Sequence, residues 1–235
     1  MKAFLLAAGF GTRLRPITDT IPKCLVTIKD KPLLEWWFEL FRKHGIDEVL
    51  VNTHYMADQV EAFVNGYTAV HRDIKVTLFY EKELLGSGGT VNANRDFIET
   101  GEDFLICYAD NLTDVNLQEL INVHRGNGSV LTMALFHTTM PEQCGIAAVD
   151  KNGLITEFVE KPESPEGNLA NAGIYVANQM LYQYFENDGF CDFGRDVLPR
   201  LVGIMYGYEI HAWLRDIGTL QNLQSAREEW AYDHL

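Results

Sequence analysis

The chain has 235 residues, of which 47% are hydrophobic and 22% charged, a composition typical of globular proteins that need no metal or disulfide to build a core. Its formal net charge of −14 argues against a nucleic-acid partner, because proteins that bind nucleic acids carry basic surfaces. An acidic chain that handles polyanions must therefore gather its few basic side chains in one place or use a divalent cation.

The cysteines and the first residues indicate the compartment. Cys24, Cys107, Cys144 and Cys191 are far apart and form no C-x-x-C pair, which argues against a disulfide framework or a zinc site and favours a reducing, cytoplasmic location. The apolar stretch before Gly9 is too short for the core of a signal peptide, so we expect a buried strand there. No apolar run is long enough to span a membrane.

Short apolar runs recur along the chain with amphipathic stretches between them. In chain order the pattern predicts strands at 3–8, 48–53, 75–80, 103–108, 130–136, 146–149, 154–159, 173–177 and 208–213, and helices at 33–44, 57–65, 90–97, 117–125, 179–185, 194–201 and 220–232. Strand and helix alternate in the first half, which predicts a parallel sheet with right-handed crossovers. The strands of this half read as near-continuous apolar runs, as expected when helices cover both faces.

The second half is less regular. Asp150-Lys151-Asn152-Gly153 separates two apolar runs and is typical of a hairpin turn, in which Asn-Gly supplies a positive φ. We therefore predict an α/β fold, with a Rossmann-like, mostly parallel sheet, helices on both faces and an inserted antiparallel hairpin region. No linker, charge block or internal repeat divides the sequence, which predicts a single domain over residues 1–235.

A glycine-rich segment follows the first predicted strand. Gly9 and Gly11 allow backbone N–H groups to approach an anion closely, and Arg13, Arg15 and Lys23 gather positive charge beside them. This is the local concentration of basic groups that the acidic composition requires. The Gly-Lys-Ser/Thr end of a Walker loop is absent, and Leu14 stands where a dinucleotide fingerprint needs a third glycine.

Two aspartates each follow an apolar run. Asp110 follows the predicted strand at 103–108, and ligands in open α/β sheets bind beyond the carboxyl ends of strands. Asp216 follows the predicted strand at 208–213. Magnesium favours one or two carboxylates together with substrate phosphate oxygens, so the two are candidate ligands. From the residues alone, Asp110 is more often a turn former or a helix cap, and Asp216 is more often a surface ion-pair partner.

The segment from Leu6 to Pro16, Leu-Ala-Ala-Gly-Phe-Gly-Thr-Arg-Leu-Arg-Pro, followed by Pro22-Lys23, resembles the signature of the sugar-1-phosphate nucleotidyltransferase family in its short, single-domain form. The resemblance extends from Met1 to about Thr219. It implies an enzyme that joins a sugar 1-phosphate to a nucleoside triphosphate and releases pyrophosphate. It also implies a Mg²⁺ cofactor, and it leaves a homo-oligomer possible.

The resemblance assigns roles to residues. It implies catalysis by Arg13 and Lys23 and a metal site at Asp110 and Asp216. Nucleotide binding falls on Ala7, Ala8, Gly9, Gly11, Thr12, Glu83 and Gly88, of which the last two lie in the loop that resembles the family's base-reading loop. Sugar-phosphate binding falls on Asn111, Gly145, Glu160, Lys161 and Asn171.

These groups suit the reaction. A phosphate monoester is largely ionised at neutral pH, so the attacking oxygen needs no general base, and the seven histidines show no triad or paired-ligand spacing. Basic side chains, backbone N–H groups and a magnesium ion would align two anions and stabilise the leaving pyrophosphate.

The base and sugar stay open at this point. The Gly-Ser-Gly-Gly loop and the short chain resemble GDP-mannose and GDP-heptose pyrophosphorylases somewhat more than the other members of the family. The alternatives are a UDP- or dTDP-sugar pyrophosphorylase, a cytidylyltransferase acting on a phosphoalcohol such as phosphocholine, and a catalytically silent subunit. The presence of Arg13, Lys23, Asp110 and Asp216 argues against the last. Arg215 adjoins Asp216, and we expect it to pair with that carboxylate in the empty protein.

Overall fold

A computed structural model describes residues 1–186 and 188–231. The chain divides into two compact units. The first unit consists of Met1–Leu84, Tyr108–Val115 and Ala212–Leu235, and the second of Leu85–Cys107 and Asn116–His211. The single domain expected from the sequence stays a prediction. No helix in the described ranges is long and apolar enough to cross a membrane.

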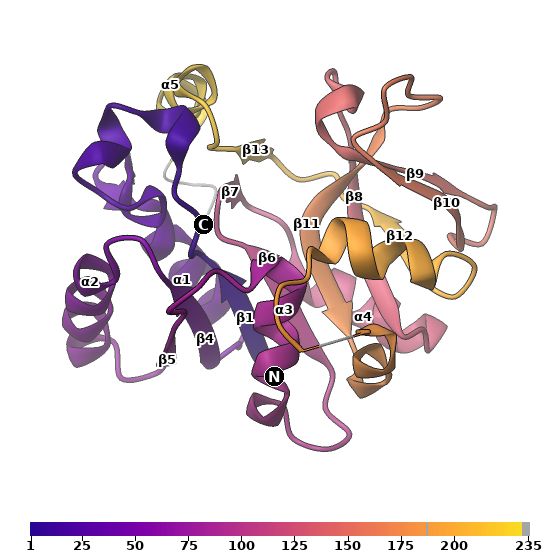
Figure 1. Cartoon of the computed structure of the whole chain (residues 1–235), viewed down its shortest axis with the longest axis horizontal. Coiled ribbons are helices and arrows are strands. Elements are labelled where there is room, and N and C mark those ends of the chain that lie inside the picture. Colours follow the sequence, from indigo (N-terminus) through magenta and orange to yellow (C-terminus); the bar gives the residue numbers. More distant parts are fainter. Residues whose placement is uncertain (187, 232–235) are drawn as a thin grey trace. The chain divides into compact units, whose positions relative to one another are not determined.

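Three parallel strands form the sheet of the first unit. They are β1 (Lys2–Leu6), β4 (Glu48–Thr53) and β5 (Lys75–Tyr80), in the order β1-β4-β5 (Figure 1). Leu5 lies opposite Val51, and Val51 lies opposite Leu78. Most side chains of β1 and β4 are buried, which explains their continuous apolar sequence. The predicted parallel pairing of these strands is confirmed.

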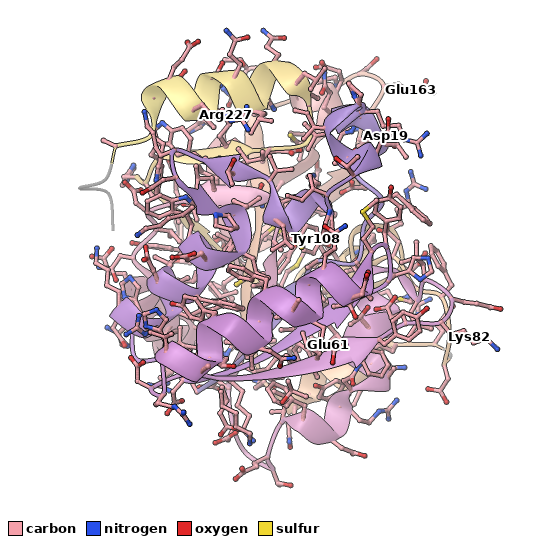
Figure 2. The ribbon with its side chains drawn as sticks, turned by 90° about the vertical axis from the view of Figure 1, so that its left-hand side faces the viewer. Asp19, Glu61, Lys82, Tyr108, Glu163 and Arg227 are labelled. Atoms are coloured by element: carbon pink, nitrogen blue, oxygen red, sulfur yellow. The ribbon has the colours of Figure 1, made fainter. Side chains whose placement is uncertain are left out.

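The helices of the first unit are α1 (Leu33–Lys43), α2 (Ala57–Val70) and α5 (Leu220–Glu229). Apolar side chains at helical spacing bury one face of α1, and the rings of Phe38 and Tyr67 bring α1 against α2 with centroids 5.1 Å apart. Arg227 of α5 donates to the carbonyl oxygen of Thr27 over 3.0 Å, which fixes α5 against the rest of this unit (Figure 2). The predicted end of this helix, residue 232, lies outside the described residues.

Two short antiparallel pairs complete the first unit. Strand β2 (Thr27–Ile28) pairs with β3 (Lys31–Pro32), and β7 (Asn111–Thr113) pairs with β13 (Leu214–Asp216). The sequence analysis did not predict these four strands, because segments of two or three residues carry no readable period.

The second unit contains the antiparallel region. Its strands are β6 (Phe104–Tyr108), β8 (Leu131–His137), β9 (Gly145–Val149), β10 (Ile155–Glu160), β11 (Leu169–Ala177) and β12 (Tyr206–Glu209). Strand β11 runs antiparallel to both β6 and β8, and β12 runs parallel to β8. The antiparallel pair β9–β10 is the predicted hairpin.

The hairpin turn forms as its sequence predicts. Gly153 adopts φ 85°, and the side-chain oxygen of Asp150 accepts hydrogen bonds from the backbone N–H groups of Asn152 and Leu154 at 2.8 and 2.9 Å. Parallel strands with crossover helices, together with this antiparallel region, confirm the predicted fold class.

The helices of the second unit depart most from the prediction. Helix α4 (Leu117–Asn127) lies as expected, but α3 (Gly86–Ala93) begins four residues before the predicted start at 90. The low helix propensity of the three glycines among residues 86–89 argued for a loop there. The predicted helix at 179–185 is a 3-10 turn, Gln179–Tyr184. The one at 194–201 is a π-helical turn, Phe193–Val197, followed by the 3-10 turn Leu198–Leu201, which contains a proline.

Candidate functional site

The glycine-rich loop leaves β1 with unused hydrogen-bond donors. Within the described part of the chain, the backbone N–H groups from Ala8 to Gly11 donate to no protein acceptor. Gly11 adopts φ 63°, and a Cβ atom there would lie 3.0 Å from Cβ of Lys23 and from Cγ2 of Thr18. Glycine at this position therefore permits both the turn and the close approach of Lys23. Unused N–H groups in a tight loop suit an anion such as phosphate.

Backbone pairing brings Asp110 and Asp216 to the same place from distant parts of the sequence. The N–H of Ala109 donates to the carbonyl of Leu6 over 3.0 Å, which holds Asp110 beside the start of the glycine-rich loop. The pairing of β7 with β13 places Asp216 opposite Asn111, and the N–H of Ile217 donates to the carbonyl of Asp110 over 2.7 Å. The two aspartates thus meet within the first unit.

Two basic side chains face these carboxylates. Lys23 Nζ lies 2.8 Å from Asp110 Oδ2 and 3.9 Å from Asp216 Oδ1, and its side chain is only 12% exposed. Arg13 Nη2 lies 3.8 Å from Asp216 Oδ2, but the Arg13 side chain is 61% exposed, so it can reach a ligand in solvent. Four of the predicted site residues therefore form one cluster, which we call the charged cluster: Arg13, Lys23, Asp110 and Asp216.

The two carboxylates of the charged cluster have shifted pKa values of opposite sign. Burial disfavours ionisation of Asp110, but the ammonium group of Lys23 at 2.8 Å outweighs it, so the pKa of Asp110 lies below its usual value. Burial raises the pKa of Asp216, and the neighbouring charge of Asp110 raises it further, against the opposing effect of Lys23 and Arg13. The ammonium group of Lys23 thus stabilises the ionised form of Asp110 more than that of Asp216.

An unsatisfied carboxylate oxygen lies in the cluster. Asp216 Oδ1 is buried and has no hydrogen-bond partner in the described structure. At Gly218 a Cβ atom would lie 2.5 Å from this oxygen and 2.6 Å from Arg13 Nη2, so a larger residue there would displace the Asp216 carboxylate or the Arg13 guanidinium group. Among the described residues no group of three or more histidine, cysteine and acidic side chains could hold a metal ion. A cation at Asp110 and Asp216 would therefore take its other ligands from water or substrate.

The residues that hold the glycine-rich loop in place were not among the predicted site residues. Asn52 Oδ1 accepts a hydrogen bond of 2.6 Å from the N–H of Ala7, and Tyr55 Oη donates to the carbonyl of Thr18 over 2.9 Å. Asn52 is 5% exposed, at the end of the otherwise apolar run of β4. A buried amide in such a run was the available signal, because buried polar groups require a partner.

In the second unit, Glu160 lies between two glycine backbones. A Cβ atom at Gly145, its cross-strand neighbour, would lie 2.6 Å from Glu160 Oε2, and one at Gly194 would lie 2.9 Å from it. Burial raises the pKa of Glu160, Lys161 lowers it and Asp192 adds to the rise. Gly145 and Gly194 thus make room for one carboxylate.

Lys161 leaves strand geometry directly after β10, although a following proline such as Pro162 normally favours an extended conformation. It adopts φ 50° directly after β10 ends, and its N–H donates to the carbonyl of Cys144 over 3.0 Å. Its ammonium group lies 3.9 Å from Glu160 Oε1, so two consecutive side chains converge instead of pointing to opposite faces. The role of Lys161 toward a sugar phosphate stays a prediction.

Asn171 and Gly88 of the second unit are engaged by their own neighbours. Asn171 Nδ2 donates to Tyr175 Oη over 2.6 Å, and its Oδ1 accepts from the N–H of Gly173. The N–H of Gly88 donates to the carbonyl of Cys191, and a Cβ atom on Gly88 would lie 2.7 Å from the Cys191 sulfur. Close packing therefore accounts for this glycine without a ligand, and its part in base recognition stays a prediction. Glu83 is exposed in the first unit.

The expectation for Arg215 is wrong. Arg215 pairs with Glu229 of α5 and lies over the ring of Trp213, because neighbouring residues of a strand point to opposite faces and Asp216 faces the other way. Arg215 therefore stabilises the packing of α5 and takes no part in the charged cluster.

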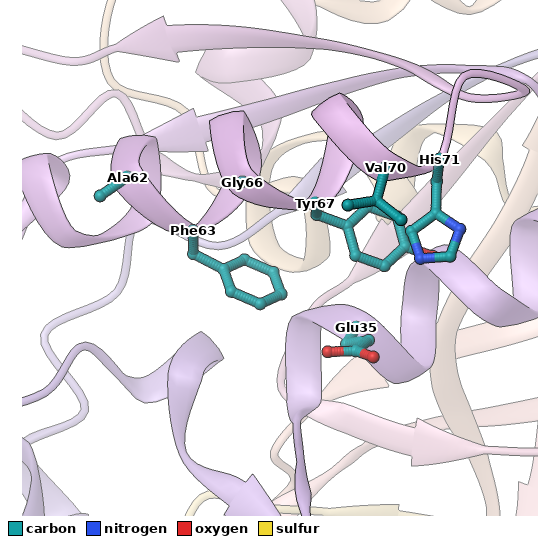
Figure 3. A pocket seen from close by; sticks show the side chains of 7 residues that line it. All are labelled: Glu35, Ala62, Phe63, Gly66, Tyr67, Val70 and His71. Carbon is teal, nitrogen blue, oxygen red and sulfur yellow. The ribbon is translucent and has the colours of Figure 1, made fainter.

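A separate surface pocket of about 350 Å³ lies between α1 and α2 (Figure 3). Glu35 of α1 faces an aromatic row on the α2 side, in which the rings of Tyr67 and His71 are stacked with centroids 4.2 Å apart. None of the predicted site residues lines this pocket.

The family model for nucleotidyl transferases matches residues 2–232 of the chain. The chain belongs to the nucleotidyl transferase family. It is 33% identical over 218 residues to a UTP–glucose-1-phosphate uridylyltransferase of Synechocystis, covering 86% of this chain and 55% of the relative. It is 32% identical over 189 residues to mannose-1-phosphate guanylyltransferase 1 of Arabidopsis thaliana, covering 79% and 52%. The chain thus spans about half the length of these curated relatives.

Solved structures match this family member almost from end to end. HddC from Yersinia pseudotuberculosis aligns with a TM-score of 0.83 at 25% identity, covering 98% of this chain and 99% of HddC. A second structure of HddC, in complex with GMP-PN, aligns with the same TM-score at 26% identity. A putative glucose-1-phosphate thymidylyltransferase from Bacillus anthracis, with a TM-score of 0.86 at 22% identity over 99% of this chain and 97% of that one, shares the fold.

Proposed function

We propose that this family member transfers a nucleotidyl group from a nucleoside triphosphate to a sugar 1-phosphate, forming a nucleotide sugar and pyrophosphate. The charged cluster carries this proposal. Arg13, Lys23, Asp110 and Asp216 come together beside a loop whose N–H groups have no protein acceptor. Membership of the nucleotidyl transferase family and the sugar-phosphate substrates named for its relatives support the reaction class.

The chemistry requires alignment and charge stabilisation more than proton transfer. An ionised phosphate oxygen of the sugar 1-phosphate attacks the α-phosphorus, and the bond from that phosphorus to the leaving pyrophosphate breaks. The N–H groups of the glycine-rich loop bind the triphosphate, and Arg13 stabilises charge that develops on the transferring group. Lys23 neutralises phosphate charge, and Lys161 with Glu160 positions the acceptor. This proposal needs no residue acting as general base.

The chain's residues fit a bound Mg²⁺. Asp216 Oδ1 is buried without a hydrogen-bond donor, and the second carboxylate, Asp110, is kept ionised by Lys23. Asp110 and Asp216 would hold the ion together with phosphate oxygens, as magnesium prefers. When bound, the ion supplies positive charge that lowers the repulsion between the two anionic substrates.

For the base and the sugar, we propose GTP with mannose 1-phosphate or a related sugar 1-phosphate. Several of the curated relatives are mannose-1-phosphate guanylyltransferases, from plants, Xenopus and Dictyostelium. HddC, which aligns with almost the whole chain, was crystallised with GMP-PN. A cytoplasmic location agrees with four free cysteines, of which three are buried.

A pyrophosphate-release assay tests the function. GTP, UTP, dTTP and CTP are each combined with mannose, heptose and glucose 1-phosphates and with phosphocholine. We expect the highest kcat/KM for GTP with mannose or heptose 1-phosphate and little release from Asp110→Asn. Preference for UTP or dTTP would correct the base and keep the reaction. Preference for CTP with phosphocholine would replace the sugar by a phosphoalcohol, and no release from any pair would refute the proposed reaction.

A further inference from the structure

The end of β4 braces the glycine-rich loop through three separate contacts. Asn52 accepts from the N–H of Ala7 at 2.6 Å. The His54 ring meets the ring of Phe10 edge-on with centroids 5.3 Å apart. Tyr55 Oη donates to the Thr18 carbonyl, and Thr18 Oγ1 in turn donates to the carbonyl of Gly11 over 2.8 Å. The first, middle and last parts of the loop are therefore all fixed from one strand end.

Asn52 also connects the loop to the segment that follows β5. Its Nδ2 donates to Glu81 Oε1 over 2.7 Å, and Glu81 is 2% exposed. The backbone of Glu81 is fixed as well, because its N–H donates to the Thr53 carbonyl over 2.8 Å and its carbonyl lies 2.8 Å from His54 Nδ1. One buried amide thus joins the ends of all three strands of the first unit's sheet: β1, β4 and β5.

The orientation of the Asn52 amide is determined by its partners. The N–H of Ala7 is a donor and requires an oxygen, whereas a carboxylate oxygen of Glu81 requires a donor unless it is protonated. Only one orientation of the amide satisfies both. A carboxylate at position 52 would still accept from Ala7 but would face Glu81 with a second acceptor, and a buried polar group left unsatisfied is costly.

We propose that Asn52 is a positioning residue for triphosphate binding. Together with Glu81 it fixes the peptide group at Ala7, which directly precedes the unused N–H groups of the glycine-rich loop and so sets their position. This rests on the proposed function, because the loop's ligand is taken to be the triphosphate. Asn52 itself is buried and acts through the Ala7 backbone. Its replacement should therefore change nucleotide affinity and leave the KM for the sugar 1-phosphate nearly unchanged.

Exchanging the amide and the carboxylate between positions 52 and 81 tests whether their hydrogen bond positions the glycine-rich loop. Asn52→Asp removes the donor and should weaken the affinity for GTP–Mg²⁺, measured by calorimetric titration, by about tenfold to a hundredfold. It should also speed hydrogen exchange at the Ala7 amide. Glu81→Gln keeps an acceptor for Asn52 and should stay within about threefold of the wild type. The double variant Asn52→Asp, Glu81→Gln restores a donor opposite an acceptor and should recover to within about threefold.

A second asparagine provides the control for a general effect of the substitution. Asn178 Nδ2 donates to the Ser129 carbonyl over 2.8 Å in the second unit, so Asn178→Asp also loses a donor. It should lower stability without changing nucleotide affinity or exchange at Ala7. The kinetic readout is the KM for each substrate together with kcat, which separates loop positioning from a loss of folded protein.

Each outcome decides between the two proposals. If Asn52→Asp leaves both GTP affinity and Ala7 exchange unchanged, or if the double variant is no better than the single one, the positioning role is refuted while the proposed function stands. A wild-type chain that binds none of the four triphosphates refutes both. Should Asn52→Asp fail to fold, the double variant decides alone, because a tenfold loss of affinity despite the restored pair would overturn the proposal.

Discussion

Lys23 interacts more closely with Asp110 than with Asp216. Lys23 makes a hydrogen-bonded ion pair with Asp110 and lies farther from Asp216, which keeps a buried oxygen without a hydrogen bond. We expect a cation or a phosphate that enters the charged cluster to change the ion pairs of Lys23. The lysine would then stabilise the carboxylates in the empty site and neutralise phosphate charge in the occupied one.

The first prediction at this scale concerns Arg13. Arg13→Ala should lower kcat by a factor on the order of 10² to 10³ and leave nucleotide affinity within about tenfold, because the guanidinium group serves charge that develops in the transition state. Arg15→Ala is the matched control: Arg15 pairs with Asp19 at 3.2 Å on the surface, and its loss should change kcat little. Equal kcat in the wild type and Arg13→Ala would remove Arg13 from the mechanism.

The second prediction concerns Asp110 and Asp216. Asp110→Asn and Asp216→Asn should each raise the Mg²⁺ concentration needed for half-maximal activity by at least about tenfold, since each removes one carboxylate ligand. The double variant should need little more Mg²⁺ than the single variant that needs more, because ligands of one ion act as a unit. Magnesium titrations of initial rates measure both. Strictly additive losses, or full activity in a chelator, would contradict a shared site.

At the scale of elements, the turn after β10 combines a backbone of positive φ with a side chain that we propose to bind the acceptor. Lys161 holds φ 50°, a conformation that glycine adopts more readily than other residues. Backbone and side chain can therefore be tested separately at one position.

Lys161→Ala and Lys161→Gly both remove the ammonium group, so both should raise the KM for the sugar 1-phosphate by the same factor, at least about tenfold, with little change in the KM for the triphosphate. The glycine variant should be about 1 kcal/mol more stable than the alanine variant, because it adopts the positive φ without strain. Steady-state kinetics and urea unfolding measure the two effects. A sugar-phosphate KM that stays at the wild-type value would exclude Lys161 from acceptor binding.

Elements with long apolar runs were predictable, and short or irregular ones were not. The bounds of β4 and β5 agree with the prediction because each strand is built on a mostly apolar run and is followed by a polar residue. The glycine-rich start of α3 and the π-helical turn at Phe193–Val197 depend on tertiary contacts that local propensity does not contain.

The candidate site shows the same division. Asp110 could be placed by its position after an apolar strand, but its meeting with Asp216 depends on a pair of three-residue strands. Asn52 was missed because its role depends on Ala7 and Glu81, which are distant in sequence.

At the scale of the whole molecule, the pH dependence of stability has an identifiable contributor. His124 is buried, and one ring nitrogen lies 3.0 Å from Thr132 Oγ1. Burial lowers the pKa of His124, Asp103 partly opposes this, and Arg125 adds to it. The unfolded chain therefore takes up a proton near pH 6.5, while the folded chain does so only at lower pH.

His124 should accordingly contribute full stability above about pH 6.5 and lose it as the pH falls below that value. Between pH 7 and pH 5 the free energy of unfolding should fall less in His124→Gln than in the wild type. Urea unfolding across this range measures both proteins. Parallel slopes for His124→Gln and the wild type would contradict the assignment.

The pairing of β7 with β13 has a consequence for biosynthesis. Asp110 and Asp216 come from opposite halves of the chain, so the ribosome releases the glycine-rich loop, Lys23 and Asp110 well before Asp216. Contacts of such large separation in sequence form slowly, because the intervening chain must first become ordered. A nascent chain arrested before β13 would hold the glycine-rich loop and one carboxylate but no paired site. The proposed metal site would thus form only after β13 has emerged from the ribosome.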